Sequence, residues 1–343
     1  MIKHMTKLTG WTAAFAAVAA TASAEVKINE NLSLDGYAIG ALAVTEGTAA
    51  QNDTFIDSGS KLIDAAKVAV NGKYGDFTSK VSLLAIPNLK SSNGTSGLLD
   101  AYVTYTKGEF AVTAGKFNSW LGYESFDSPN NAFITYGAAD NVGYIANYDT
   151  GVKAEYLTKT FSAGVSVRDS NLGDPDGGFF QGDGEYSDDQ GYEAYILYSG
   201  IEKLTVFLGT GYEDVNGASS TYSYNVWASY AATDKLTLVA SYASNKNAAT
   251  GTEVTFAYTL LATYAINDKI SVSGRFGQAD GHAGTIAQFG NPVATASNYT
   301  DYGIASTYTI NSNFAVKGEV SKQDYNDGTG DTFFYAVQGI FKF

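Results

Sequence analysis

The feature that most constrains the fold is a short hairpin pattern that occurs seven times along the chain. Each copy has a Tyr, a short polar turn, and an apolar residue at which the alternation of apolar and polar side chains begins again. Alternation with a period of two is typical of strands that have one apolar and one polar face, and Asn, Asp and Gly suit the turns. The pattern therefore predicts fourteen antiparallel strands. The seven pairs are Tyr74/Phe77, Tyr105/Phe110, Tyr156/Phe161, Tyr198/Leu204, Tyr230/Leu236, Tyr264/Ile270 and Tyr308/Phe314.

Longer polar segments separate these hairpins, and all four prolines fall within them. Because proline cannot donate to a β-ladder, its placement supports these strand boundaries. One more strand is expected before the hairpins, near 32–44, and one after them, near 331–343. We predict an all-β fold, a transmembrane antiparallel β-barrel of about 16 strands, with short periplasmic turns alternating with long external loops. A soluble antiparallel β-sandwich or a secreted repeat protein is the alternative.

The N-terminal segment has a different composition from the rest of the chain. It combines a basic start, an Ala-rich apolar stretch at 8–20 and Ala-Ser-Ala at 22–24. These are the three parts of a secretory signal peptide with its cleavage site. We expect residues 1–24 to be a cleaved signal peptide of a bacterial outer-membrane protein and 25–343 to be a single barrel domain. A retained anchor helix is the alternative, although the apolar stretch is short for crossing a bilayer.

Composition excludes several classes of function. The chain has no cysteine, so disulfides and thiolate metal sites are excluded. The formal net charge of −14 argues against a nucleic-acid partner. His282 is the only histidine after the first 24 residues, and no nucleophile–base, zinc-protease or phosphate-binding motif is present. Since enzymatic barrels need a base for their nucleophile, we predict that the protein is not an enzyme.

The tyrosines before the short turns are expected to form an aromatic girdle at the periplasmic membrane interface. These are Tyr74, Tyr105, Tyr156, Tyr198, Tyr230, Tyr264 and Tyr308. The last strand alternates aromatic residues on one face and ends with Phe341 and Phe343. Such an ending resembles the C-terminal assembly signal of outer-membrane barrels. Outer-membrane lipid, lipopolysaccharide and the barrel-assembly machinery are the partners expected from these features.

Charged residues of the strands are expected to face the lumen, because a charge that faces lipid costs roughly 2–4 kcal/mol near the midplane. A barrel of 16 strands leaves an aqueous channel rather than a filled core. These charges can line the channel, or they can simply pair with one another along the wall. By alternation, the inward set is Lys80, Asp100, Lys153, Glu155, Arg168 and Arg275.

One aromatic segment, at 115–136, breaks the alternation. It connects the fifth strand, at 110–116, to the sixth, at about 145–157, and is therefore the third long loop. We expect it to fold into the lumen and to narrow the channel. Its candidate constriction residues are Trp120, Tyr123, Glu124, Phe126, Asp127 and Asn130.

Two side-chain roles are expected within this loop. The carboxylates of Glu124 and Asp127 can face the wall cations Lys80, Lys153, Arg168 and Arg275, and such opposed charges would filter ions and orient polar solutes. The alternative is that these carboxylates only cap the loop's own turns. The aromatic side chains can pack the loop against the wall or offer stacking faces to sugars.

The same loop carries a family resemblance. Gly115-Lys116-Phe117, Leu121-Gly122-Tyr123-Glu124 and Asp127-Ser128-Pro129-Asn130-Asn131 resemble the corresponding segment of the OmpL-like putative β-barrel porin-2 family. The resemblance is densest over residues 110–140. It implies an outer-membrane porin and no defined substrate.

Two acidic segments are similar to calcium-binding loops. Asp, Asn and Gly alternate at 324–331, and acidic residues are dense at 169–189. Such oxygen donors suit calcium, but neither segment has the spacing of an EF-hand. We expect no cofactor, with loop calcium as the alternative to a solvated or lipopolysaccharide-facing loop.

These features together predict a porin, a passive diffusion channel for small hydrophilic solutes such as ions or sugars. The acidic composition favours a mild preference for cations, which the inward arginines and lysines oppose. The alternative is a non-conducting structural or adhesive outer-membrane barrel whose acidic loops bind partners. A homotrimer is expected by analogy with other sixteen-stranded porins.

Overall fold

The computed structural model describes residues 25–47, 53–54, 61–87, 95–140, 148–169, 190–214, 220–247, 252–281, 298–326 and 330–343. They form one antiparallel sheet of sixteen long strands, with the two-residue strands β1 (Val26–Lys27) and β3 (Asp53–Thr54) added at its edge. The long strands are β2 (Leu32–Glu46), β4 (Asp64–Tyr74), β5 (Phe77–Ile86), β6 (Thr95–Lys107), β7 (Phe110–Asn118), β8 (Tyr148–Leu157), β9 (Phe161–Arg168), β10 (Gln190–Ile201), β11 (Leu204–Asp214), β12 (Thr221–Ala231), β13 (Leu236–Asn247), β14 (Thr252–Asn267), β15 (Ile270–Gly281), β16 (Asn298–Thr309), β17 (Phe314–Tyr325) and β18 (Gly330–Lys342).

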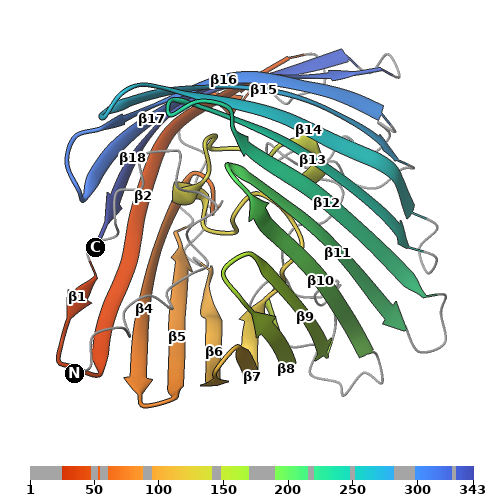
Figure 1. Cartoon of the computed structure of the whole chain (residues 1–343). Coiled ribbons are helices and arrows are strands. Elements are labelled where there is room, and N and C mark those ends of the chain that lie inside the picture. The colour runs from red at the N-terminus through yellow and green to blue at the C-terminus, as the bar shows by residue number, and fades with distance from the viewer. Residues whose placement is uncertain are drawn as a thin grey trace.

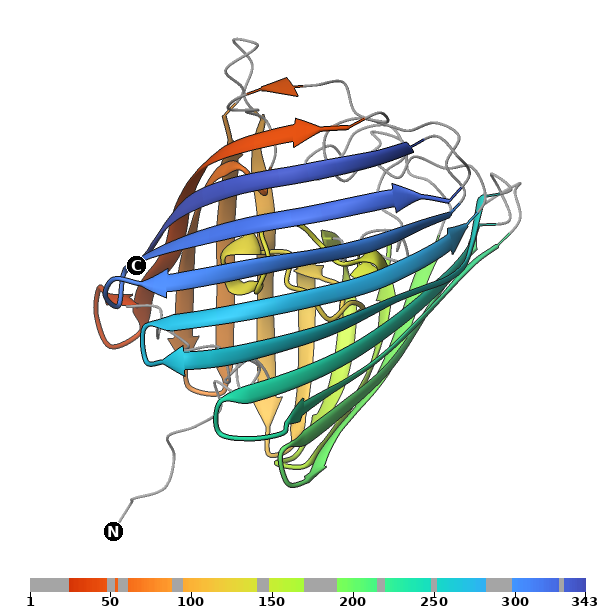
Figure 2. The ribbon, with the colours of Figure 1, turned by 90° about the horizontal axis from the view of Figure 1, so that it is seen from above.

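The sheet closes on itself, because its last strand pairs with its first. The β18–β2 ladder runs from Phe333 opposite Glu46 to Lys342 opposite Tyr37. Two backbone hydrogen bonds between Gly36 and the final residue extend the seam, with N···O distances of 2.8 and 3.1 Å. Figures 1 and 2 show the resulting barrel from two directions. The predicted antiparallel barrel of sixteen strands is confirmed.

The seven predicted hairpins are all present, and the second strand of each begins at the predicted apolar residue. Two of the turns contain Gly75 and Gly108, with φ angles of 61° and 60°. Glycine adopts this left-handed backbone at little cost, which explains its place in two-residue turns.

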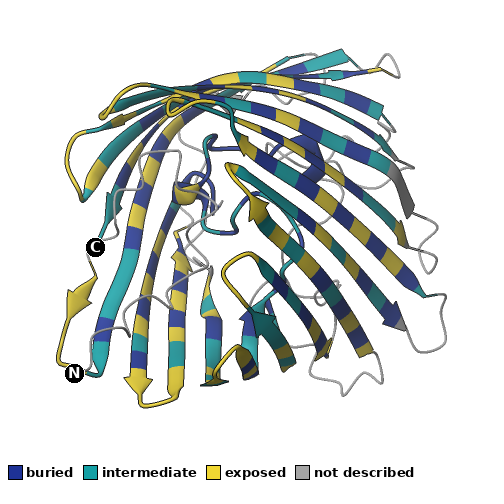
Figure 3. Cartoon of the chain, in the orientation of Figure 1, coloured by how far each residue is buried: buried dark blue, intermediate teal, exposed yellow. Residues whose placement is uncertain are grey.

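Each strand shows one exposed and one buried face, seen as alternating bands in Figure 3. On β9, Val165 and Val167 are exposed, whereas Ser166 and Arg168 between and beside them are buried. Exposed large apolar residues extend over the whole outer wall, as at Ile304 on β16, with 65% exposure. An exterior of this kind suits lipid, so the soluble sandwich or repeat protein is not the fold observed.

Aromatic residues form two rows on this exterior, one along the turn side and one along part of the opposite side. At the turn side, six of the seven predicted girdle tyrosines are exposed; Tyr156 is half-buried and donates to Glu109 Oε2 at 3.1 Å. The sequence analysis missed a second row of aromatic residues. On five strands it lies six residues from the turn-side aromatic residue, on the same face, which is about 20 Å along the strand. Its members and their turn-side counterparts are Tyr192/Tyr198, Tyr224/Tyr230, Tyr258/Tyr264, Tyr302/Tyr308 and Tyr335/Phe341.

The turn-side row continues through the predicted assembly signal. Phe341 contacts Phe314 at a ring-centroid distance of 4.8 Å and Phe343 at 5.8 Å. Elsewhere in this row Phe77 contacts Tyr105 at 5.0 Å. The aromatic end of the chain is thus packed into the girdle.

The described part of the sixth strand, Tyr148–Leu157, lies within the predicted range of about 145–157. One predicted detail is wrong: long connections do not alternate strictly with short ones, since only residues 248–251 separate β13 from β14. The strands β13 and β14 continue past the residues at which their alternation of apolar and polar side chains ends. The proposed signal peptide, His282 and most of the acidic segment at 169–189 lie outside the described residues. Among the described residues, no helix is long and apolar enough to cross a membrane.

Candidate functional site: the inward loop

The segment between β7 and β8 lies inside the barrel, and its described part, residues 119–140, is called the inward loop below. Figures 1 and 2 both show it within the ring of strands. Two residues shape it locally: Pro129 within the short 3-10 helix η2 (Ser128–Asn130), and Gly122, whose φ of 101° lies in the left-handed region. Asn131 closes a turn with Ser125 through bonds of 2.7 and 2.9 Å. The loop is therefore compact and largely buried.

The first half of the loop packs on an aromatic row along the inner wall. Tyr195 on β10, Phe207 on β11 and Trp227 on β12 stack with centroid distances of 5.8 and 5.3 Å. Trp120 extends the row at 4.6 Å from Tyr195, and Leu121 packs against the row. Tyr123, also from the loop, meets the last of these rings edge-on at 5.4 Å. The loop's aromatic residues thus pack against the wall.

Polar contacts accompany this apolar contact. Ser119 Oγ donates to Glu193 Oε1 at 2.6 Å, and Gly122 N donates to Asn225 Oδ1 at 3.1 Å. Glu193 also lies 3.2 Å from Arg168. The predicted wall residue Arg168, with 2% exposure, therefore serves a wall–loop network through Glu193 rather than meeting a loop carboxylate.

The side chain of Asp127 binds the opposite wall, at β2 and β4. Lys67 Nζ on β4 donates to both of its oxygens, at 3.1 and 2.9 Å, and Tyr37 Oη on β2 donates to Oδ1 at 3.2 Å. Lys67 also lies 3.6 Å from Asp100, whose other partner is Ser82. The expectation that Asp127 faces Lys80, Lys153, Arg168 or Arg275 is wrong in its partner: the cation is Lys67, which sequence reasoning did not select.

A third wall, made of β15 to β18, holds the second half of the loop by charged groups. Lys317 Nζ donates to the carbonyls of Ser128, Asn131 and Phe133, with distances of 3.3, 2.6 and 3.4 Å. Lys342 Nζ donates to Pro129 O at 3.1 Å, and to the predicted loop residue Asn130, at Oδ1, at 2.9 Å. These amines thus bind loop carbonyls and an amide oxygen.

Arg275 is the centre of this charged contact. Its Nε lies 2.9 Å from Asp301 Oδ2, and NH1 donates to Thr135 O at 2.8 Å. Glu319 accepts the backbone N–H groups of Ile134 and Thr135 at 2.5 and 3.1 Å. The guanidinium also lies 4.3 Å from the centre of the Phe133 ring. A buried ion cluster of the wall is therefore completed by the loop's backbone.

Glu124 binds the loop itself, as in the turn-capping alternative, and it also interacts electrostatically with Arg275, one of the predicted wall cations. Its Oε2 accepts Gly137 N at 2.5 Å, and Asp140 Oδ1 accepts Tyr123 N at 2.6 Å. Burial, together with the negative charge of the neighbouring Asp140, raises the pKa of Glu124 to about 8. Burial raises the pKa of Asp140 to about 7, against the opposing effect of the backbone N–H groups of Tyr123 and Glu124. The two ends of the loop are joined by this carboxylate pair.

The end of the first external connection also reaches the inward loop. Lys61 Nζ lies 3.4 Å from the centre of the Phe126 ring, and Ser128 Oγ donates to Lys61 O at 3.4 Å. Burial lowers the pKa of Lys61 to about 7, which Asp127 partly opposes. Phe126 meets Tyr148 edge-on at 4.9 Å. The predicted aromatic Phe126 is thus enclosed between a lysine and a tyrosine.

The remaining predicted wall charges lie on β5 and β8. Lys80 is half-buried opposite Asn71 and Tyr102, and no ion pair involves it in the described chain. Lys153 lies 3.9 Å from Glu155 and 5.1 Å from the Trp120 ring. The inward groups that the sequence analysis did not select follow the same alternation; they are Lys67, Asp301, Lys317, Glu319 and Lys342.

The carboxylates proposed as calcium ligands have other partners where they are described. Asp324 and Asp331 lie 3.3 and 3.1 Å from Lys322 Nζ. Within the part of the chain that the structure describes, no group of three or more Asp, Glu, His or Cys side chains is placed to hold a metal ion.

The closed barrel and its inward loop define the class of protein: a sixteen-stranded outer-membrane channel of the porin type. The family model described as "Putative beta-barrel porin-2, OmpL-like" matches residues 36–343. The chain belongs to this family, as its loop motif predicted. No curated protein matches the chain.

Solved structures with this fold are distant in sequence. The outer-membrane channel DcaP of Acinetobacter baumannii superposes with a TM-score of 0.62 at 16% identity, covering 91% of this chain and 97% of that one. An anion-selective porin from Comamonas acidovorans gives 0.64 at 13% identity, with 91% and 99% covered. OmpT of Vibrio cholerae in its trimer form gives 0.59 at 14% identity, with 92% and 100% covered. At these identities the likeness concerns the fold.

Proposed function

We propose that this porin is a passive diffusion channel for small hydrophilic solutes in which the inward loop sets the size limit. The observation that carries the proposal is that the loop binds the wall on three sides: β10 to β12, β2 with β4, and β15 to β18. A segment fixed at so many points around the lumen leaves solutes only the space beside it. No covalent chemistry is required of the protein.

The nature of the loop's contacts supports a fixed constriction rather than a freely moving lid. Arg275, with 4% exposure, and Glu319 are buried ion partners that also bind the loop backbone: Arg275 NH1 donates to Thr135 O, and Glu319 Oε2 accepts Ile134 N. Withdrawal of the loop would remove those bonds, and hydrogen bonds to charged groups contribute about 1.5–3 kcal/mol each. The resting conformation is thus the one in which the loop spans the lumen.

Single-channel recording in planar bilayers tests this function. Folding of the barrel is first checked by its resistance to unfolding in detergent before it is heated. The refolded barrel is expected to give discrete conductance steps in KCl. Neutral sugars of increasing size added to both chambers should cease to lower the conductance above a definite size. A folded barrel that never conducts would overturn the proposal and favour the structural or adhesive barrel.

The same proposal extends to assembly and location. We propose that residues 1–24 direct export and are removed, and that the barrel forms a homotrimer; the trimer form recorded for the OmpT structure supports the second point. Mass spectrometry of the purified protein tests the first, with an N-terminus at Glu25 expected. Cross-linking in outer membranes tests the second.

A further inference from the structure

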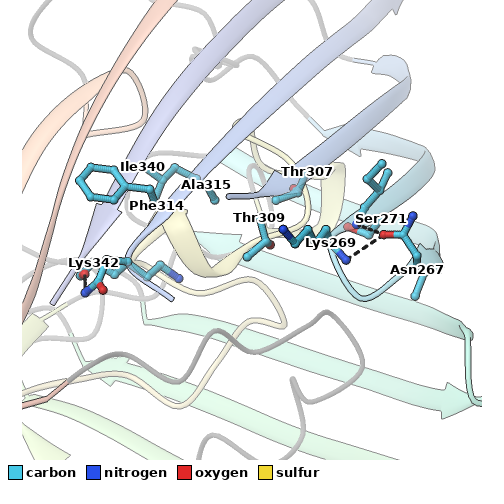
Figure 4. A pocket seen from close by; sticks show the side chains of 12 residues that line it. Asn267, Lys269, Ser271, Thr307, Thr309, Phe314, Ala315, Ile340 and Lys342 are labelled. Atoms are coloured by element: carbon cyan, nitrogen blue, oxygen red, sulfur yellow. Dashed lines mark hydrogen bonds between the residues drawn. The ribbon is translucent and has the colours of Figure 1, made fainter. Parts of the chain in front are cut away.

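A hollow in the inner wall lies at the turn side of β14 to β18, below the inward loop. It encloses about 530 Å³, including the part that is open to solvent. Its floor consists of small inward-facing residues, among them Ser271, Thr307, Thr309 and Ala315. Figure 4 shows Lys269 and Lys342 on opposite sides of Thr309 and Ala315. The lining of the hollow is thus mainly apolar, with a few hydroxyl groups and two lysines among its residues.

The two charged residues that line this hollow, Lys269 and Lys342, are both cations. No Asp or Glu is among the described residues that line it. Within the described chain, no carboxylate lies within ion-pair distance of Lys269 or Lys342, nor of Lys317, which binds the same loop segment as Lys342. This differs from the other inward cations of the loop contact. Those cations, Lys67, Arg168 and Arg275, each have a carboxylate partner.

The amine of Lys342 uses two of its three N–H donors to bind the loop. It makes two hydrogen bonds to the loop, to Pro129 O and Asn130 Oδ1, whereas an ammonium group carries three donors. Lys269 stands in the exposed turn between β14 and β15, where its backbone N donates to Asn267 Oδ1 at 2.9 Å. Hydroxyl groups on the floor add further donors between these two amines.

We propose that this hollow is a binding subsite for small anions at the turn-side mouth of the channel, with Lys269 and Lys342 as its charged groups. The inference rests on the proposed channel function for its role: anions that pass the loop would be held briefly at this mouth. It implies that permeation favours anions at this point of a chain whose net charge is −14. Asp127, the loop carboxylate close enough to act on Lys342, is already bound by Lys67 and Tyr37.

Anion binding is tested on the folded barrel in detergent, independently of conductance. Inorganic phosphate is the probe, and broadening of its phosphorus NMR line reports binding. Wild type is compared with Lys269→Glu, which lies in an exposed turn and holds no part of the loop, and with Lys342→Glu. The control is Lys159→Glu, which makes the same charge change in the exposed turn between β8 and β9, away from the hollow.

Wild type and Lys159→Glu are expected to bind phosphate equally, and each hollow variant about 30-fold more weakly, since Lys→Glu changes the charge near the ligand by two units and each is worth roughly 1 kcal/mol in water. Reversal potentials in a KCl gradient should move toward cation preference in the same two variants only. Absence of phosphate binding, or equal loss in Lys159→Glu, would overturn the anion subsite. A barrel that binds phosphate but does not conduct would overturn the channel function alone.

Discussion

The inward loop meets the barrel wall in two chemically different ways. On β10 to β12 the contact is apolar, with Leu121 and Trp120 against a row of stacked rings. On β15 to β18 it is ionic, with Arg275, Lys317 and Glu319 bound to the loop backbone. Apolar burial is non-directional, whereas hydrogen bonds to charged groups demand specific positions of donors and acceptors. The aromatic side therefore attaches the loop, and the ionic side fixes its course.

The two contacts also differ in which atoms of the loop the wall binds. The apolar contact depends on side chains of the loop, while the ionic contact engages mainly main-chain carbonyls and N–H groups of residues 128–135. Substitutions in that part of the loop can leave its backbone bonds intact. Changes in the wall cluster cannot, because each wall group serves several bonds at once.

Removing the central cation should therefore have the largest effect. Arg275→Leu leaves Asp301 and Glu319 buried without their cation and removes two bonds to Thr135. Breaking a buried ion pair in this way costs about 3–5 kcal/mol. We expect a lower denaturant midpoint for unfolding in detergent and a noisier, larger single-channel conductance.

A triple variant tests whether the lost stability comes from the unpaired negative charges. Adding Asp301→Asn and Glu319→Gln to Arg275→Leu removes the unpaired negative charges, so the triple variant should regain part of the lost stability. If the single variant is as stable as wild type, the ionic side does not fix the loop.

A smaller effect is expected on the apolar side. Leu121→Ala removes a fully buried side chain from the contact with Phe207 and Trp227. Such a truncation costs about 2–5 kcal/mol in stability. Because the ionic contact remains, the mean conductance should change less than in Arg275→Leu. A larger conductance change in Leu121→Ala would reverse the roles assigned to the two sides.

The smallest effect is expected from pH. The pKa values of Glu124 and Asp140 are raised, mainly by burial, so the folded loop holds more protons than the unfolded chain between about pH 4.5 and 8. The stabilising contribution is full below that range and is lost as the pH rises to about 8. Current fluctuations should be more frequent at pH 8.5 than at pH 5.5.

Glu124→Gln tests the origin of this pH dependence. The amide keeps an oxygen that can accept Gly137 N and cannot ionise, so the difference between the two pH values should shrink. Equal pH dependence in wild type and variant would assign the effect to other groups.

The barrel itself could be predicted from the sequence because its signal is local. A Tyr, a turn and an apolar restart lie within a few residues of one another, and the structure places the strand starts where this pattern does. The loop-side ends of the strands were harder to place. Residues 243–247, Ala-Ser-Asn-Lys-Asn, look like a loop by composition, yet they pair with β12.

The partners across the lumen could not be predicted in the same way. Alternation tells which side of the wall a residue faces, but contact between Asp127 and Lys67, 60 positions apart, depends also on the relative heights of distant strands. That stagger is set by the register of the whole ladder. The same holds for Glu319, which meets the backbone of Ile134.

The central claim is that the inward loop limits conduction, and deletion of residues 122–131 tests it most directly. Those residues include Asp127 and most of the segment bound by Lys317 and Lys342, while the barrel strands are unchanged. Single-channel conductance of the folded deletion variant is compared with that of wild type in the same KCl solution. A clear rise in conductance and in the size of permeant sugars is predicted. An unchanged conductance in a correctly folded variant would contradict the account.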